Sequence, residues 1–281
     1  MSDADRAKLF KLYKTVGTTK VWQIKNAIDA TPFFFVSGMS VDVDGAPNAY
    51  APIGTGKPLD YLGNANSDYK TMKGKWTSIV TDKGKPIQQT SKQPFPGHYI
   101  STTSLHDSHF KGNDPKHYVD AGKIPYIALP NKYFSSTGLQ LGDFALVINA
   151  NNGKSCFVIF ADTKNLPNLG EASVKTAELL GLPTDLRWKE KKKAGDKTAQ
   201  PAGTNSGIIT LVFPGSAKYL GHEQGHRILT EEEIQLYGKF HLYRFAIIDH
   251  DDTFSLSFSN DYAQFTKALE QCGYLFMCRD T

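Results

Sequence analysis

Two acidic residues, Asp162 and Glu171, combine a residue type and a spacing suited to acid–base hydrolysis. Asp162 ends an apolar run and Glu171 follows Gly170, and the eight residues between the two acids include Pro167, which favours a fold-back. Glycoside hydrolysis uses such a pair, because one acid protonates the leaving oxygen while the other acts as base or nucleophile. Strands also end in Asp and helices begin with Glu for structural reasons, so the spacing alone leaves a structural role open.

The elements expected around this pair would hold both carboxylates on rigid backbone. Residues 155–161 predict an apolar strand that ends at Asp162, and residues 171–181 predict a helix that begins at Glu171 and ends in glycine. A helix N-terminus stabilises negative charge, which favours Glu171 as the ionised partner and Asp162 as the acid. Burial acts in the opposite direction, so the two roles stay open.

The rest of the chain predicts many short strands and few helices. Turn residues bound the expected strands, which are residues 33–36, 37–45, 76–80, 98–103, 124–129, 143–149, 155–161 and 207–213. The run Asn151-Asn152-Gly153-Lys154 predicts a hairpin turn, and residues 3–16 carry helical spacing of apolar side chains. The fold class indicated is mainly β with α+β decorations, built on a small closed barrel.

Two regions are expected along the chain. Residues 1–220 would form the main domain with its N-terminal helix, and residues 221–281 would form an extension of β-β-α character packed on it. Thr230 and Glu233 form a capping box that predicts a helix start. The later elements of the extension are expected at residues 240–248 and 253–258 as strands and at 261–272 as a helix.

Composition and charge exclude several classes of protein. The chain has 281 residues, 40% hydrophobic and 21% charged, with a net charge of +4 and no long basic stripe, so nucleic acid is not an expected partner. The densest basic stretch, residues 187–197, reads as an exposed loop. No apolar segment is long enough to span a membrane, and the first residues do not resemble a signal peptide. Three cysteines are too few for a disulfide framework.

Several stretches carry a likeness to one known family, and they occur here in the same order. They are Val41-Asp-Val-Asp-Gly45, Leu59-Asp-Tyr-Leu-Gly-Asn-Ala65, Gly97-His-Tyr-Ile-Ser-Thr-Thr-Ser-Leu105, Tyr118-Val-Asp-Ala121, Ile124-Pro-Tyr-Ile-Ala-Leu-Pro130, Leu141-Gly-Asp-Phe-Ala145, Ala161-Asp162, Gly170-Glu-Ala-Ser173 and Val212-Phe-Pro-Gly-Ser216. Over residues 33–216 the chain resembles the chitosanases of glycoside hydrolase family 75.

This resemblance implies an endo-acting, inverting hydrolase of β-1,4-linked glucosamine chains on a core related to the double-psi β-barrel. The family's essential Asp and Glu correspond to Asp162 and Glu171, and no cofactor or metal is implied. Asp42, Asp44 and Asp143 match other acidic positions, where they would bind cationic sugars or cap turns. The polysaccharide substrate places the expected activity outside the producing cytoplasm, although the chain shows no signal peptide.

A second hypothesis keeps the same fold and catalytic pair but assigns a different polysaccharide substrate. A protein with a net charge of +4 gains no long-range attraction to polycationic chitosan, and the same charge favours an anionic glycan such as peptidoglycan. The chain would then be a muramidase or lytic effector delivered by a secretion machine, with an inhibitor or immunity protein as partner. A non-catalytic glycan-binding module is a third reading, against which the presence of both carboxylates speaks.

A competing motif is His222-Glu223-Gln224-Gly225-His226, which matches the H-E-x-x-H pattern of zinc peptidases. That chemistry requires both histidines on one face of a helix. Gly225 weakens a helix there, and the capping box at Thr230 places the helix start further on. A zinc metallopeptidase is therefore the weaker alternative, with Glu233 or Glu270 as the conceivable third ligand.

Overall fold

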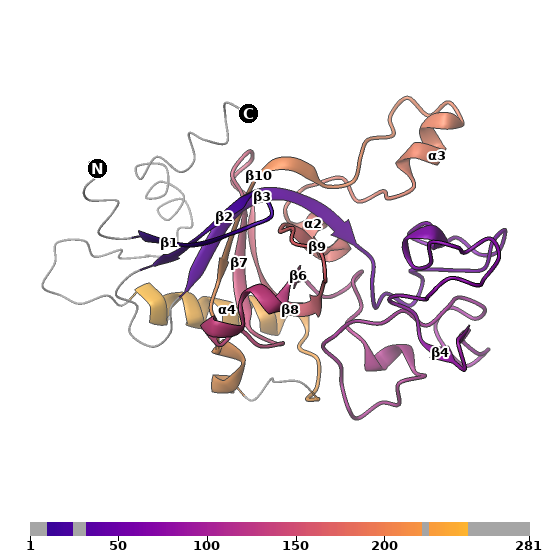
Figure 1. Ribbon diagram of the computed structural model, residues 1–281, viewed down its shortest axis with the longest axis horizontal. Coiled ribbons are helices and arrows are strands. Elements are labelled where there is room, and N and C mark those ends of the chain that lie inside the picture. The colour runs from indigo at the N-terminus through magenta and orange to yellow at the C-terminus, as the bar shows by residue number, and fades with distance from the viewer. Residues whose placement is uncertain (1–9, 25–31, 221–224, 247–281) are drawn as a thin grey trace, which may run out of the picture.

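The computed structural model describes residues 10–24, 32–220 and 225–246, and its centre is a closed β-barrel of six strands (Figure 1). The structure is 30% strand and 18% helix, which confirms the expected mainly-β class. The strand order around the barrel is β3-β10-β7-β8-β6-β9, and β9 closes it by pairing with β3. The bounds are β3 Phe33–Asp42, β6 Tyr126–Leu129, β7 Phe144–Asn149, β8 Ser155–Thr163, β9 Glu171–Ser173 and β10 Thr204–Val212.

The barrel strands are continuous apolar runs because both of their faces are covered. All six residues of β7 are buried, and so are the three consecutive phenylalanines that begin β3. The two strands expected at 33–36 and 37–45 are one strand, β3, which ends before a turn at Gly45 (φ 77°). The hairpin turn predicted at 151–154 does join β7 to β8, with Gly153 in the left-handed region at φ 74°.

The chain begins, within the described residues, with a β-hairpin rather than the predicted helix. β1 (Phe10–Val16) pairs antiparallel with β2 (Thr19–Ile24) across a turn at Gly17, and β2 continues the pairing onto β3. The helix predicted at 3–16 is therefore wrong over 10–16, and residues 3–9 lie outside the described residues. The helical spacing of a few apolar side chains is outweighed here by pairing with a neighbouring strand, a tertiary interaction that local sequence does not contain.

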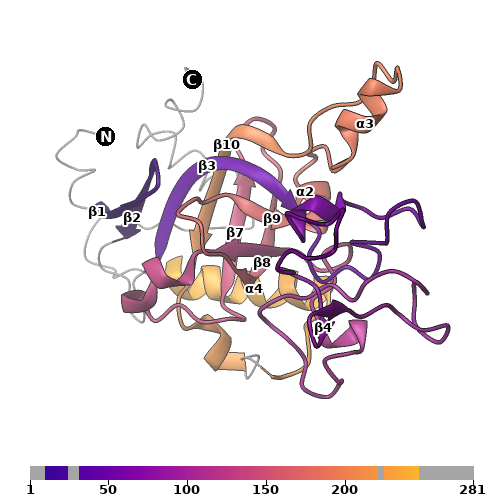
Figure 2. The same ribbon diagram turned by 45° about the vertical axis from the view of Figure 1, so that its right-hand side comes forward.

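One long helix, α4 (Glu231–Ala246), packs against β7 and β8 (Figure 2). Thr230 and Glu233 form the predicted capping box, in which each backbone N–H donates to the other residue's side chain, at 2.9 and 3.3 Å. Gln235 bonds both backbone groups of Phe157 on β8. The strand predicted at 240–248 is wrong over 240–246, because the helix continues there with His241 and Leu242 buried. The elements predicted at 253–258 and 261–272 lie outside the described residues.

The remaining helices are short, and they decorate the barrel. α2 (Val174–Leu179) follows β9, and α3 (Trp188–Lys193) makes part of the basic stretch helical, where an exposed loop was expected. Single-turn 3₁₀ helices occur at Leu62–Asn64, Pro115–His117, Asn131–Tyr133, Ser135–Thr137 and Ser216–Leu220. Within the ranges the structure describes, no helix has both the length and the apolar character needed to cross a membrane.

A large loop region, residues 43–125, lies beyond the end of β3 (Figure 1). The strands predicted at 76–80 and 98–103 are wrong, because these segments make only isolated bridges, Ile79 with Ser101 and Gln88 with Tyr99. The one small sheet in this region pairs β4 (Thr81–Asp82) with β5 (Lys85–Pro86). The loops fold back onto the strand ends of the barrel, which is where the acidic residues meet.

Candidate active site

Strand β6 places Asp162 and Glu171 on its two sides at the same level. Ala128 of β6 pairs with Asp162 of β8 on one edge and with Glu171 of β9 on the other. Residues paired directly across neighbouring strands project to the same face of the sheet. The two predicted catalytic residues therefore share one face, with a single strand between them.

A register shift in β8 is what turns Asp162 toward this face. Ile127 pairs with Phe160, but the next residue, Ala128, pairs with Asp162, so Ala161 is an extra residue in β8. Without this β-bulge, Ala161 would lie opposite Ala128 and the side chain of Asp162 would point to the other face. The carbonyl of Ala161 accepts a hydrogen bond from the Leu105 N–H at 2.8 Å, so the loop region stabilises the bulge.

Glu171 belongs to a strand and not to the helix that the sequence predicts. It is the first residue of β9, whereas α2 begins at Val174 with Ser173 as its N-cap. The argument that a helix N-terminus stabilises the charge of Glu171 therefore does not apply. Its position depends on Gly170 (φ 88°), whose carbonyl accepts from Ser40 N–H at 2.7 Å, and where a Cβ atom would lie 2.0 Å from the Gly38 carbonyl oxygen.

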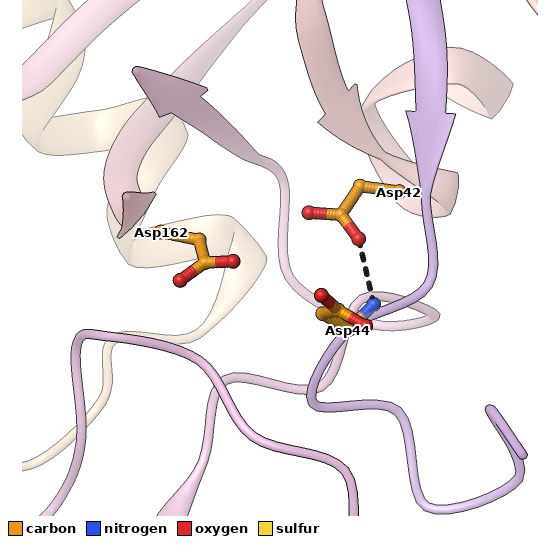
Figure 3. Close-up of side chains that lie close together, drawn as sticks. All are labelled: Asp42, Asp44 and Asp162. Carbon is orange, nitrogen blue, oxygen red and sulfur yellow. Dashed lines mark hydrogen bonds between the residues drawn. The ribbon is translucent and has the colours of Figure 1, made fainter. Parts of the chain in front are cut away.

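Asp42, the last residue of β3, and Asp44, in the turn that follows it, join this site. Ser40 pairs with Glu171, so Asp42 projects to the same face two residues further along. Figure 3 shows Asp42, Asp44 and Asp162 pointing toward one another, and each offers one oxygen within 4.8 Å of the others. Two of the three predicted substrate-binding aspartates are thus brought to the predicted catalytic pair. We call Asp42, Asp44, Asp162 and Glu171 the carboxylate cluster.

Each aspartate of the cluster has hydrogen-bond partners. Asp42 accepts the Asp44 N–H at 2.8 Å and also contacts the Tyr126 hydroxyl. Asp44 accepts the Tyr50 hydroxyl at 2.9 Å and contacts the Ser78 side chain. Asp162 accepts both the N–H and the hydroxyl of Ser104, at 2.8 and 2.7 Å.

One lysine and one tyrosine also contact members of the cluster. Lys164 forms an ion pair with Glu171 at 2.7 Å, with only 12% of the lysine side chain exposed. The Tyr126 hydroxyl donates to the Asp44 main-chain oxygen at 2.9 Å. The cluster therefore sets four carboxyl groups against one ammonium.

Burial and like charge raise the pKa of three members. The pKa of Asp42 is raised to about 8, first by burial and then by the nearby Glu171 and Asp162 carboxyls. Burial, followed by the charges of Asp42 and Asp162, raises the pKa of Asp44 well above its usual range. The pKa of Asp162 is also raised by burial, and the two hydrogen bonds from Ser104 oppose that rise. The cluster consequently holds protons at neutral pH that isolated carboxyls would have lost.

Asp143, the third predicted substrate-binding residue, lies apart from the cluster. Its side chain has no exposed surface, and its two oxygens accept the N–H groups of Gln140, Gly215 and Ala217 at 2.8–3.0 Å. This carboxylate ties the start of β7 to the turn after β10. The turn-capping role left open by the sequence accounts for all of these contacts.

Sequence reasoning missed four residues that shape the site, namely Ser104, Lys164, Tyr50 and Tyr126. Lys164 lies in the eight-residue connection between the two acids, so its proximity to one of them was the only sequence signal available. Ser104 is 58 residues from Asp162, and no spacing rule relates them. Tyr126 is separated from Asp44 by 82 residues, and it reaches the cluster only because the barrel closes.

Two places in the chain carry residue types that bind metal ions, the carboxylate cluster and the H-E-x-x-H motif. Asp42, Asp44 and Asp162 are the one grouping, among residues the structure describes, whose spacing could hold an ion such as Mg²⁺ or Ca²⁺. His222 and Glu223 lie outside the described residues. Gly225 (φ 90°) bridges to Asp107, so the described end of the H-E-x-x-H motif is not helical.

Comparison with known proteins identifies no relative of this chain. The chain matches no protein-family model, and a search of curated proteins finds nothing similar to it.

Proposed function

We propose that the chain is an endo-acting glycoside hydrolase that cleaves a β-1,4-linked amino-sugar polysaccharide with Asp162 and Glu171. The observation that carries this proposal is the pairing of both acids with Ala128, which puts them on one face with β6 between them. Two carboxyl groups that flank a scissile bond are the shared requirement of glycoside hydrolases. The resemblance to family 75 chitosanases supports the same pair, and a double-psi connection of the barrel strands is part of the proposal.

The separation of the two acids favours inversion at the anomeric carbon. Two strand spacings put the backbones of the two acids about 9.5 Å apart. Inverting enzymes hold their carboxyl groups roughly 6.5–9.5 Å apart, which leaves room for a water molecule, and retaining enzymes hold them roughly 5 Å apart. Side chains that extend in parallel from the two strands would keep the wider separation that inversion needs.

The surroundings of the two acids assign their roles. Burial raises the pKa of Asp162, which favours this residue as the acid that gives a proton to the glycosidic oxygen as the bond breaks. Glu171 forms an ion pair with the Lys164 ammonium at 2.7 Å, which favours it as the base. Its carboxylate takes a proton from water, whose oxygen attacks the anomeric carbon from the opposite side.

The local charge favours a cationic sugar as substrate. Asp42 and Asp44 add two further carboxyls next to the reacting pair, and Lys164 is already committed to Glu171. Because the pKa values of Asp42 and Asp44 are raised, the ammonium group of a bound glucosamine unit would shift these carboxyls toward their ionised forms, which compensate its charge, whereas an anionic glycan would oppose that ionisation. The overall charge of +4 argues for peptidoglycan instead, so both polymers belong in the test.

The test is product release from chitosan and from purified peptidoglycan, by wild type and by Asp162→Asn and Glu171→Gln variants. We expect chitosan to be cut, each substitution to lower the rate by about 10²–10⁴-fold, and a chelator to have no effect. NMR of the first product should show the α-anomer. Asp82→Asn, an exposed carboxylate on β4, is the matched control and should keep full activity.

Other outcomes would redirect the proposal. Release from peptidoglycan alone would keep the carboxylate pair and change the substrate. Activity that survives both substitutions, or that is lost only with chelator, would overturn the mechanism.

A further inference from the structure

A polar hollow of about 350 Å³ lies in the loop region, away from the carboxylate cluster. Its two walls are the segments 87–93 and 109–114, which a hydrogen bond from the Gln93 amide to the Asn113 carbonyl (3.0 Å) ties together. Its volume falls within the roughly 300–1,000 Å³ of small-ligand sites.

The lining combines an aromatic ring with neutral hydrogen-bonding groups. Phe110 is 37% exposed although it is large and apolar, and the hollow also contains Gln88, Thr90, Gln93 and Asn113. Lys111 and Asp114 contribute one charge of each sign, so the lining has no excess of either. A ligand with an apolar face and a rim of neutral polar groups fits this composition, and a sugar ring is such a ligand.

A buried aspartate fixes an exposed histidine at this hollow. Asp107 is 5% exposed, and its carboxylate accepts from both the backbone N–H (2.9 Å) and the Nδ1 of His109 (2.7 Å). The His109 side chain is itself 73% exposed. The contact fixes the orientation of the His109 ring, and Nε2 is not part of it. A ring nitrogen held in one orientation on an exposed residue is suited to ligand binding.

Both walls of the hollow continue into segments that hold the cluster. The segment of His109 and Phe110 leads back to Ser104, which donates to Asp162. The other wall leads to Ser101, whose hydroxyl accepts the N–H of Gly45, next to Asp44. The hollow and the cluster are therefore held by the same two segments of the chain.

We infer that this hollow is an accessory subsite for a neutral, N-acetylated sugar unit of the polymer. The inference rests on the proposed function for the identity of the polymer. The cluster, with its excess of carboxyls, takes a cationic unit, whereas the hollow, lined by amides and an aromatic ring, takes an acetamido unit. The two sites together select a partly acetylated chain.

A binding measurement on a variant that cannot hydrolyse its substrate tests the accessory subsite independently of catalysis. The full chain carrying Glu171→Gln, in which hydrolysis is blocked, is titrated by calorimetry with the tetramer of N-acetylglucosamine and with the tetramer of glucosamine. We expect Phe110→Ala in this background to weaken binding of the acetylated tetramer by at least 10-fold, and His109→Ala to weaken it as well. Phe240→Ala, which truncates an exposed aromatic residue on α4, is the matched control and should bind like its parent.

The outcomes distinguish this inference from the proposed function. Equal binding by the Phe110→Ala variant and its parent, or no binding of the acetylated tetramer by either, overturns the accessory subsite. If the wild type releases no product from any polymer but Phe110→Ala still weakens binding, the hollow is a saccharide site and the proposed hydrolase activity fails. If product is released and Phe110→Ala binds normally, only the subsite fails.

Discussion

The turn that holds Asp143 and the strand ends that hold Asp42 both bury an aspartate, but they surround it with different partners. Asp143 has no exposed surface and receives three backbone N–H groups. Asp42 is 8% exposed and receives one backbone N–H, from Asp44, while three further carboxyls lie around it. Burial raises the pKa of both side chains, to about 6 for Asp143 and about 8 for Asp42.

This difference separates a structural acid from a functional one. With a pKa of about 6, Asp143 is ionised at neutral pH, and its backbone donors make that charge part of the fold. With a pKa of about 8, Asp42 is protonated at neutral pH, first because burial and then because the charges of Glu171 and Asp162 disfavour its ionised form. A cluster in which three buried acids have raised pKa values destabilises a fold, and such sites commonly have a function that retains them.

The largest effect is expected when the donors of Asp143 lose their acceptor. In an Asp143→Ala variant, three buried N–H groups have no protein partner, at about 1–3 kcal/mol each. We therefore expect the free energy of unfolding to fall by about 3–5 kcal/mol, a large part of the roughly 5–15 kcal/mol that a domain possesses. Chemical denaturation monitored by circular dichroism would measure it.

The matched comparison is Asp162→Asn, which changes the carboxylate cluster but does not affect the three backbone N–H groups that donate to Asp143. Its unfolding free energy should stay near that of wild type while its activity is lost. An Asp143→Ala protein that unfolds at the wild-type denaturant concentration would contradict the structural role assigned to Asp143.

An effect of the opposite sign, which grows with pH, is expected from Asp42→Asn. The pKa of Asp42 is higher in the fold than in the unfolded chain, so its contribution to stability is full below about pH 4 and is lost as pH rises through about 8. Asparagine does not titrate. The variant should match wild type near pH 4 and gain stability relative to wild type as pH rises to about 8, by up to about 1.4 kcal/mol per pH unit, the value for one proton.

The two aspartates differ in the pH range over which they act. Asp143, with a pKa of about 6, has lost nearly all of its proton in both the folded and the unfolded state above about pH 7. Unfolding curves of Asp143→Asn should therefore run parallel to wild type in that range, whereas those of Asp42→Asn should be flatter. Equal slopes for wild type and Asp42→Asn between pH 6 and 8 would show that Asp42 is not the proton-holding member.

The barrel was largely predictable from the sequence, because its strands carry their own signal. The apolar runs that became β7, β8 and β10 are bounded by turn residues, and Gly153 fixes the hairpin between the first two. Errors occurred where pairing or packing outweighed local spacing. Residues 10–16 became a strand because β2 pairs with them, and residues 240–246 became helix because they continue α4, which packs on β7 and β8.

The site was predictable in its residue types but not in its geometry. Asp162 faces Glu171 only because one extra residue, Ala161, enters β8, and a hydrophobic pattern does not reveal a bulge inside a fully apolar strand. Glu171 lies on a three-residue strand whose only partners, β3 and β6, are distant in sequence. The crowding that raises the pKa of Asp42 depends on four acids from three strands and a turn.

The smallest effect is expected from Ser104→Ala, which raises the pKa of Asp162 further and so makes this acid more like Asp42. The substitution removes one of the two Ser104 donors to the Asp162 carboxylate and keeps the backbone N–H, so the unfolding free energy should fall by only about 1 kcal/mol. Because the hydroxyl lowers the pKa of Asp162, its loss raises that pKa further. The acid then stays protonated to higher pH, so the fall in rate on the alkaline side of the pH–rate profile shifts to higher pH. Ser135→Ala, which changes an exposed residue of a short 3₁₀ helix, is the control that should leave the profile in place. A high-pH limb that does not move in Ser104→Ala would mean that a group other than Asp162 donates the proton.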